Sequence, residues 1–379
     1  MSAPEEAVEL LARLVEIDSV NPSLVPGGAG EGEIARFIAG WAEDAGLEVQ
    51  VLEATAGRPS VIVRARGSGG GRGLLLCGHI DTVGVDGMNE PHVARVAGDR
   101  LYGRGAYDMK AGVTAALVAC RAAAGLELTG DVVVAAVADE EHASLGVQEA
   151  LDALTADAAI VTEPTELELA TAHKGFVWLE IEVRGRAAHG SRPHLGIDAI
   201  VKSGRVLTSI GALDERLRAY EHPLLGRGSV HASLIEGGRE LSTYPDRCTI
   251  KLERRTLPGE SGADAEWEVH ELLAACRATD PELDAQVRTL LVREPFEVSR
   301  EERIVATVSA AAEEVLGAAP PMAGVSYWAD SAFLGTAGIP TVLFGPTGEG
   351  AHAAEEWVSL ADTVECARVL TAVADDFCR

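Results

Sequence analysis

Apolar and polar residues follow two rhythms along the first half of the chain, one typical of helices and one typical of strands. Helical spacing covers three segments, residues 4–16, 31–45 and 111–124. Short apolar runs that predict buried strands lie at residues 48–53, 60–65, 73–77, 131–138 and 158–161. Helices that alternate with such strands predict an α/β fold, in which a mostly parallel sheet is covered by helices.

The pattern changes near Lys174. Residues 176–183 alternate like a half-exposed strand. The segments after it predict a helix, two strands and a second helix, at residues 196–213, 229–235, 247–254 and 263–276. Helical spacing returns at residues 301–316, and a short apolar run at 341–344 predicts a further strand. We therefore predict a larger domain split into residues 1–173 and 290–379, with an inserted α+β domain at 174–289.

The charge of the chain excludes several partners. Its 379 residues contain 59 Asp and Glu against 32 Lys and Arg, a formal net charge of −27. Such a surface repels nucleic acid and anionic membranes, so we expect neither as a partner. No apolar run is long enough for a membrane-spanning helix. The start of the chain lacks signal-peptide features, and the six cysteines are dispersed without a C-x-x-C pair, so we expect free thiols and a cytoplasmic protein.

The first candidate for chemistry lies at the end of the apolar run 73–77, where His79 and Asp81 follow. Residues two apart on a strand point to the same face, so the two side chains can meet. The pair suits a metal-binding imidazole whose second ring nitrogen is held by a carboxylate.

The second candidate is Asp108, in the segment 102–112 that opens the Ala-rich helix. The pair Gly103-x-Gly105 suggests a dinucleotide-binding fingerprint, but Asp108 occupies the place of the third glycine and no clear strand precedes the motif. We reject that interpretation. For an isolated aspartate at a helix start, a capping role would be the simpler explanation.

Further acidic clusters end the next apolar runs. Glu140 and Glu141 follow the strand at 131–138, and Glu163 follows the strand at 158–161. Adjacent residues point to opposite sides, so one of the two neighbouring glutamates can bind a metal while the other faces the reacting atom. His352 lies on a glycine-rich loop near the C-terminus. Taken singly, each of these residues is better explained as an ordinary surface or core residue than as a metal ligand.

Together, these residues indicate a metal site. Open α/β sheets place their sites beyond the carboxyl ends of the strands, so the clusters should converge. Carboxylates that converge repel one another, and divalent cations are the natural compensation. Mixed histidine and carboxylate ligands suit zinc first, with cobalt or manganese as alternatives.

In order and spacing, the motifs around His79, Asp108, Glu141, Glu163 and His352 resemble the family of co-catalytic di-metal amidohydrolases. That family (M20-type) includes acetylornithine deacetylase, succinyl-diaminopimelate desuccinylase, aminoacylase and glutamate carboxypeptidase. The resemblance spans essentially the whole chain. It implies a catalytic domain of zinc-aminopeptidase type, two metal ions per chain, and an inserted domain that acts as a lid and forms a homodimer.

The resemblance also implies roles for single residues. His79 and Glu163 would bind one metal, Glu141 and His352 the other, and Asp108 would bridge them. Asp81 would orient His79. Glu140 would be the general base that activates a metal-bridged hydroxide.

Two residues of the inserted domain match the family as well. His189 would stabilise the tetrahedral intermediate, from its own subunit or from the partner of a dimer. Arg255 would hold the substrate carboxylate, although the neighbouring Arg254 is an alternative. Relatives often carry a substrate-contacting asparagine near the segment 242–245, where this sequence has none.

The implied activity is the hydrolysis of an N-acyl amino acid, as in acetylornithine deacetylase. A desuccinylase, a dipeptidase or a carboxypeptidase of the same family is the alternative within this chemistry. A metal-binding homologue without catalysis is the alternative from another class, and the presence of Glu140 and of every proposed ligand argues against it.

Overall fold

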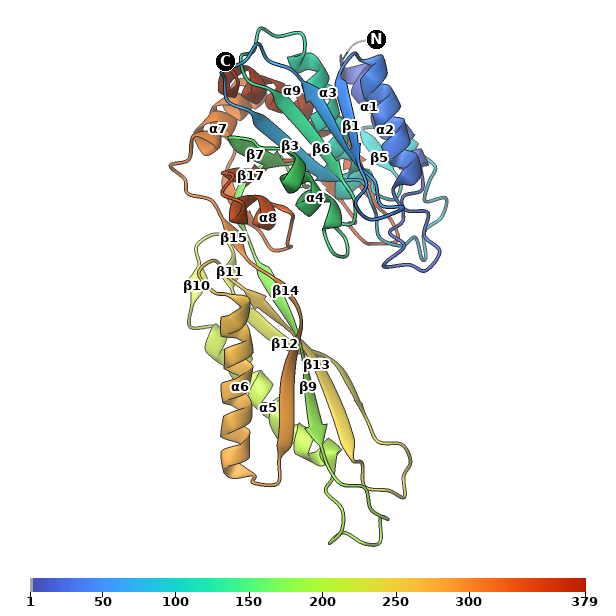
Figure 1. The fold of residues 1–379 in the computed structure, drawn as a ribbon, viewed down its shortest axis with the longest axis vertical. Coiled ribbons are helices and arrows are strands. Elements are labelled where there is room, and N and C mark those ends of the chain that lie inside the picture. Colours follow the sequence, from blue (N-terminus) through green and yellow to red (C-terminus); the bar gives the residue numbers. More distant parts are fainter. Residues whose placement is uncertain (1–2) are drawn as a thin grey trace. The chain divides into compact units, whose positions relative to one another are not determined.

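The computed structural model describes residues 3–379, which form two compact units (Figure 1). The first unit contains the chain up to Thr171, then Val298–Ala323 and Ala329–Arg379. The second contains Ala172–Glu297 and Gly324–Trp328. The middle of the chain thus builds a unit of its own, and the C-terminal part returns to the first.

A mixed sheet forms the centre of the first unit. Its strands, in spatial order, are β1 (Glu48–Leu52), β2 (Ser60–Ala65), β6 (Val132–Val137), β3 (Leu74–His79), β7 (Ala158–Val161), β17 (Thr341–Leu343) and β8 (Leu169–His173), with β16 (Met322–Val325) also paired to β8. The four neighbours β6, β3, β7 and β17 are parallel, whereas β1, β2 and β8 pair antiparallel. Strands β3, β6 and β7 are buried along their whole length, as expected where both faces are covered. The predicted α/β class with a largely parallel sheet is confirmed.

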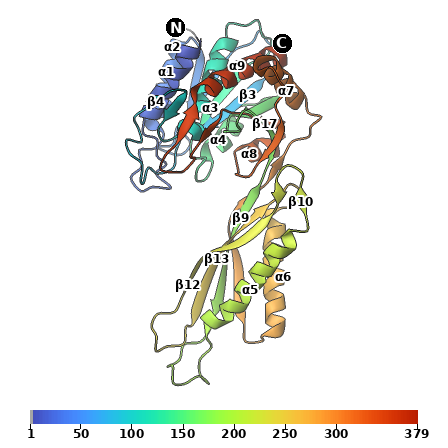
Figure 2. The same cartoon turned by 180° about the vertical axis from the view of Figure 1, so that it is seen from behind.

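Helices cover both faces of this sheet. They are α1 (Ala3–Glu16), α2 (Gly32–Asp44), α3 (Ala111–Ala123), α4 (Leu145–Ala153), α7 (Arg303–Leu316), α8 (Ser331–Thr336) and α9 (Leu360–Phe377). Helices α1, α3, α7 and α9 contact one another on one face (Figure 2), α4 and α8 contact each other on the opposite face, and α2 packs along β1 and β2. The sequence pattern did not predict α4, α8 or α9. The carboxyl ends of the parallel strands are the edge at which open α/β sheets place their sites.

A second, smaller sheet lies in the first unit. Its order is β18 (Gly348–Glu349), β19 (Trp357–Ser359), β5 (Arg100–Tyr102) and β4 (Arg95–Ala97). Because β19 pairs with β5, the loop that precedes Trp357 is brought beside the loop that follows Tyr102. These two loops carry His352 and Asp108, which are far apart in the sequence.

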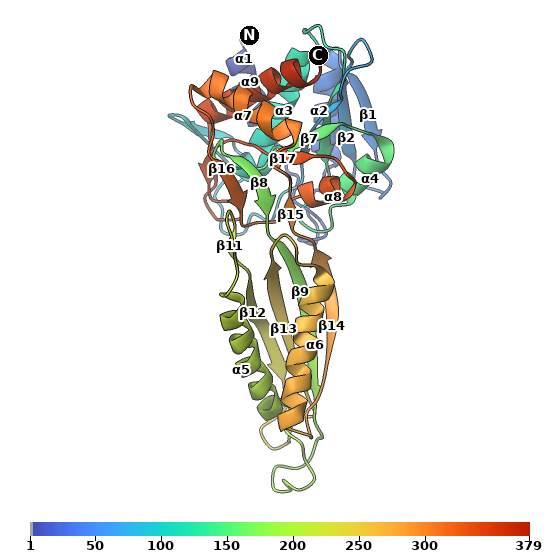
Figure 3. The same cartoon turned by 90° about the vertical axis from the view of Figure 1, so that its left-hand side faces the viewer.

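The second unit is an antiparallel sheet covered by helices. Its strands, in order, are β12 (Ser229–Gly237), β13 (Arg247–Thr256), β9 (Gly175–Arg184) and β14 (Asp284–Arg293). The short strands β10 (Glu221–His222) and β11 (Gly226–Arg227) form a separate pair, and β15 (Phe296–Glu297) pairs with the end of β8, as the last strand of the large mixed sheet. Helices α5 (Ala199–Leu217) and α6 (Gly262–Thr279) lie side by side on one face (Figure 3) and share an apolar core with the sheet.

The second unit, Ala172–Glu297 with Gly324–Trp328, differs from the predicted insertion at 174–289, most of all at its C-terminal end. Residue 289 falls inside β14, which pairs with β9 along its length, so the second unit continues to Glu297. In β14, exposed residues alternate with mostly half-buried ones, and only Ala285 is fully buried, so the strand lacks the continuous apolar run of a buried strand. Among residues 3–379, no helix is both apolar enough and long enough to cross a membrane.

Candidate metal centre

The site is built on the end of β3. His79 is the last residue of this strand and is 2% exposed. Its Nε2 lies 3.1 Å from Asp108 Oδ1 and 3.8 Å from Glu163 Oε1. Its Nδ1 lies 3.0 Å from the backbone oxygen of Asp81 and 3.7 Å from the Asp81 carboxylate. The backbone oxygen of Asp81 is thus the nearer of the two partners that hold the ring.

Asp108 lies between two histidines. One carboxylate oxygen, Oδ1, faces His79, and the other, Oδ2, lies 3.2 Å from His352 Nε2. The same His352 nitrogen lies 3.2 Å from Glu141 Oε2. The approach of the Asp108 segment to β7 requires Gly112, where a Cβ atom would lie 1.8 Å from the backbone oxygen of Thr162. The two oxygens of the Asp108 carboxylate therefore face two different histidines.

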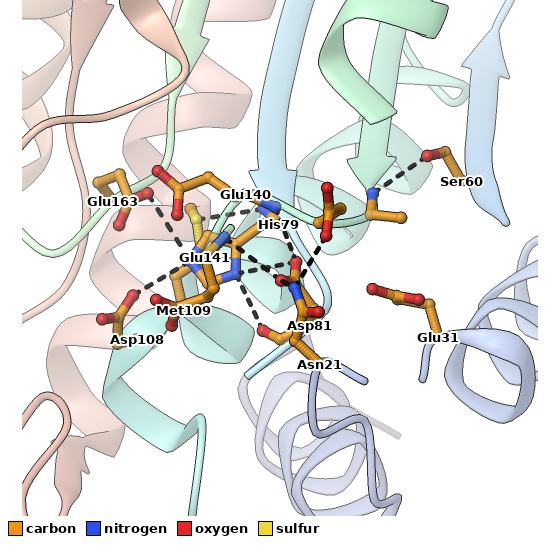
Figure 4. A network of polar contacts seen from close by, with 12 residues as sticks. Asn21, Glu31, Ser60, His79, Asp81, Asp108, Met109, Glu140, Glu141 and Glu163 are labelled. Carbon is orange, nitrogen blue, oxygen red and sulfur yellow. Dashed lines mark hydrogen bonds and ion pairs between the residues drawn. The ribbon is translucent and has the colours of Figure 1, made fainter. Parts of the chain in front are cut away.

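The two neighbouring glutamates come from the turn after β6. Their backbone N–H groups donate to the Asp81 carboxylate, at 3.1 Å for Glu140 and 3.3 Å for Glu141. Figure 4 shows Glu140, Glu141 and Glu163 gathered around His79. Asp81 therefore fixes the turn that carries both glutamates, in addition to its contact with His79.

The donor set fits a divalent cation. Single donor atoms of His79, Asp108 and Glu141 all lie within 4.8 Å of one another. The buried Oε1 of Glu141 has no hydrogen-bond partner within residues 3–379, although buried polar atoms are nearly always paired. An imidazole with several carboxylates is a ligand set that zinc and similar metals accept.

Carboxylates outnumber histidines at this site, so without a cation their negative charge is not balanced by the protein. Burial, together with neighbouring carboxylates, raises the pKa of Glu140, Glu141 and Glu163 above the ordinary value. Although burial alone would lower it, the pKa of His79 is raised well above its usual value by the hydrogen bond with Asp108 and by nearby negative charge. Hydrogen bonds with Asp108 and Glu141 raise the pKa of His352 to about 10. Without a cation, the cluster retains protons to offset its own negative charge.

This imbalance predicts how the stability of the metal-free protein depends on pH. A folded pKa above the unfolded one means that the folded state binds more protons, so stability falls as the pH rises between the two values. For His352 that window runs from 6.5 to about 10, and His79 and the three glutamates act in the same direction. We expect chelator-treated protein to have a lower Tm near about pH 8 than near about pH 6, and added zinc to raise Tm more at the higher pH.

Thermal melts followed by circular dichroism would measure both effects. The His352→Asn variant provides the control, since it lacks one of the raised groups and should show a smaller fall in Tm. A metal-free Tm that increases across this pH range would contradict the prediction.

A buried polar network, which no sequence motif indicates, lies behind the site. Asn21 Nδ2 donates to Asp81 at 2.7 Å and to Asp139 at 3.0 Å. Arg58 contacts Asp139 at 2.8 Å and holds both oxygens of Glu31, at 2.7 and 2.6 Å. Arg58 is 7% exposed, and the other residues of the network are fully buried. A Pro-flanked Asn and an isolated Arg carry no local signal of such a role.

Another buried carboxylate lies close to the site. Asp330 is 2% exposed, and its charge contributes to the raised pKa of Glu140 and of Glu163. Asp330 ends the segment Tyr327-Trp328-Ala329-Asp330. Its aspartate belongs to the first unit with the metal centre, whereas Trp328 belongs to the second.

The remaining candidates lie in the second unit. His189 is exposed on a loop, and its Nδ1 contacts Ser191 Oγ at 2.8 Å. Arg254 is buried and bonds to Glu260 and Glu268, so it anchors α6 to the sheet.

Arg255 points to the opposite face of β13. It pairs with Glu253 at 2.8 Å, and its guanidinium lies 5.1 Å from the centre of the Phe176 ring. Of the two neighbouring arginines, Arg255 is therefore the one that remains accessible to a ligand.

Comparisons with known proteins agree with this geometry. The model of peptidase family M20/M25/M40 matches residues 75–376. The chain is 29% identical over 385 residues to an acetylornithine deacetylase of Proteus mirabilis (strain HI4320), covering 98% of this chain and 96% of the relative. It is 30% identical over 347 residues to an acetylornithine deacetylase of Myxococcus xanthus, covering 89% of this chain and 86% of the relative.

Solved structures share the fold. A tripeptidase from Staphylococcus aureus superposes with a TM-score of 0.81 at 18% identity, covering 99% of both chains. A dinuclear metal-binding peptidase of the M20 family from Bacillus subtilis superposes with a TM-score of 0.74 at 16% identity, covering 99% of this chain and 98% of that one. The predicted family and enzyme class are confirmed. The chain is a metal-dependent amidohydrolase and belongs to peptidase family M20/M25/M40.

Proposed function

We propose that this enzyme hydrolyses the amide bond of an N-acyl amino acid with the help of two divalent cations, and that N-acetylornithine is the first substrate to test. The similarity to acetylornithine deacetylases over nearly the whole chain carries this proposal. Zinc is the expected metal, with cobalt or manganese as alternatives.

The proposed ligands divide into two sets around Asp108. His79 and Glu163 would hold one cation, Glu141 and His352 would hold the other, and Asp108 would be the ligand common to both. The two Asp108 oxygens support this division, since each faces a different histidine. Two cations bound there would supply Lewis-acid activation of a water molecule and of the substrate carbonyl.

Glu140 is the proposed general base. Its backbone is fixed by Asp81, and its side chain lies beside His79 (Figure 4). Its carboxylate accepts the proton of the attacking water and delivers it to the departing amine. This role separates it from Glu141, whose oxygen lies against His352.

His189 and Arg255 are proposed to act on the substrate. His189 would donate to the oxyanion of the tetrahedral intermediate through Nε2, because Ser191 occupies Nδ1. Arg255 would pair with the substrate carboxylate in place of Glu253.

We further propose that the second unit is a lid that forms a homodimer. Its edge strand β12 supports this, because the strand has a neighbour on one side only and is exposed over most of its length. Leu234 and Ile235 are 57% and 51% exposed on it. An unpaired, apolar edge strand is a template for pairing with another chain.

His189→Ala should lower kcat about 10²- to 10³-fold, which is the usual cost of a lost oxyanion donor. Metal content should not change. His194→Ala is the matched control, because it removes an exposed histidine of the same loop and should leave kcat unaltered. If His189 acts across a dimer, mixing this variant with Asp108→Asn should restore part of the activity through hybrid dimers.

The experiment that tests the function combines metal analysis with a substrate panel. Purified protein should contain close to two cations, lose hydrolysis on chelation and regain it with zinc or cobalt. N-acetylornithine, N-succinyl-diaminopimelate and dipeptides, assayed side by side, then rank the substrate classes. A preference for a succinylated substrate or a dipeptide would assign the enzyme to a different activity of the same family. Negligible rates on every N-acyl amino acid would refute the deacylase assignment.

A cytoplasmic location is also proposed. All six cysteines are free and buried, which fits a reducing compartment. Fractionation of the source cells, followed by immunodetection, would check it, and recovery in an extracytoplasmic fraction would contradict it.

A further inference from the structure

An ion pair between Arg104 and Glu356 lies buried next to the metal centre. The two residues are 2% and 1% exposed, and Arg104 Nη1 lies 2.6 Å from Glu356 Oε2. They are 252 residues apart in the sequence. Burying two charges costs more free energy than their attraction usually returns, so such a pair is weak evidence of a role in stability.

The carboxylate of Glu356 holds the loop that carries Asp108. Its Oε2 accepts the backbone N–H of Gly105 at 3.1 Å. Its Oε1 accepts the N–H of Tyr107 at 2.9 Å and that of Asp108 itself at 3.1 Å. Gly105, with φ at 76°, adopts a left-handed conformation that lets these successive N–H groups converge. The glycine motif that suggested a nucleotide site therefore surrounds a side chain of the same protein.

Arg104 connects two further loops. Its Nε donates to the backbone oxygen of Gly84 at 3.1 Å, and its Nη2 donates to that of Ala353 at 2.9 Å. Gly84 lies three residues after Asp81, and Ala353 is the residue directly after His352. A planar guanidinium can satisfy a carboxylate and two carbonyl oxygens in fixed directions, which the flexible ammonium of lysine does not reproduce.

From these contacts we propose that Arg104 and Glu356 are positioning residues that set the distance between Asp108 and His352 for the cation these two share. The inference rests on the proposed function. The pair touches neither substrate nor metal; it acts through the backbone of the two ligand loops. Groups that orient metal ligands typically change metal affinity about 10- to 100-fold when they are replaced.

Arg104→Lys tests the proposal, and Arg254→Lys is its matched control. Arg254 is equally buried, at 1% exposure, and is likewise held by carboxylates, those of Glu260 and Glu268, but it lies in the second unit. Both variants should lose thermal stability. Titration of the metal-free proteins with Co²⁺, followed by visible absorption, should show one of the two sites weakened about 10- to 100-fold in Arg104→Lys, with both affinities retained in Arg254→Lys.

Glu356→Gln provides a second variant of nearly the same shape. The amide must direct NH₂ at either Arg104 or the backbone N–H groups, so a donor faces a donor and the loop shifts. The Co²⁺ absorption of the shared site should change in this variant, and excess Co²⁺ should restore most of the turnover.

The outcomes separate the two proposals. If the wild-type protein binds two cations and the variants bind them as tightly, with unchanged spectra, the positioning role is overturned. The proposed function is then unaffected. Equal weakening in Arg254→Lys would assign the effect to general destabilisation and also overturn the role. Wild-type protein that binds no cation would overturn both proposals.

Discussion

Replacing Glu140 with glutamine is expected to lower kcat by about 10³-fold, within the range that general acid–base groups contribute. Glutamine has nearly the same shape but cannot accept the proton of the attacking water. The backbone N–H of residue 140 would still bond to Asp81, so the turn that carries Glu141 should keep its conformation. Steady-state kinetics and elemental analysis of the same preparation would measure turnover and metal content together.

The neighbouring glutamate provides the control for this experiment. Glu141→Gln changes the same chemical group one residue away, but Glu141 faces His352 and Asp108 rather than the proposed water. It should lose or weaken one cation, whereas Glu140→Gln retains both. Full activity in Glu140→Gln would assign the proton transfer to another residue, and loss of metal from it would make Glu140 a ligand.

Replacing Asp108 with asparagine is expected to weaken both cations and to reduce kcat/KM by at least about 10³-fold, since several kcal/mol of charge stabilisation are lost. The carboxylate faces a histidine with each of its oxygens, at 3.1 and 3.2 Å. Asparagine keeps one oxygen and presents an NH₂ group, which cannot bind a cation, with the other.

Single-site variants distinguish a bridging role from an ordinary ligand. Glu163→Gln and Glu141→Gln should each weaken one cation and leave the other in place, while Asp108→Asn weakens both. Calorimetric titration with zinc would give the number and affinity of the sites in each variant. If Asp108→Asn retained one site at wild-type affinity, the bridge would be disproved and Asp108 reassigned to a single metal.

Much of the fold and of the candidate centre could be predicted because both depend on local pattern. Buried parallel strands are continuous apolar runs, and β2 and β7 have the same limits in the structure as in the prediction. Since the carboxyl ends of such strands share one edge, the sequence alone was enough to expect His79, Glu140 and Glu163 near one another.

Other elements gave no comparable signal. The strand β14 is only partly buried, so its pattern did not stand out from a loop. The choice between Arg254 and Arg255 also needed the structure. Neighbours on a strand point to opposite faces, and the sequence does not say which face of β13 meets α6.

The sequence by itself determined the fold class, the family and the residue types that can bind metal, because these follow from periodicity and from motifs within a few residues. The tertiary structure alone decided which distant side chains support them. Arg58 reaches Asp139, and Arg104 reaches Glu356, only because loops far apart in the chain pack together and exclude water. The physical reason is that a buried ion pair depends on the spatial approach and desolvation of its partners, which no local pattern encodes.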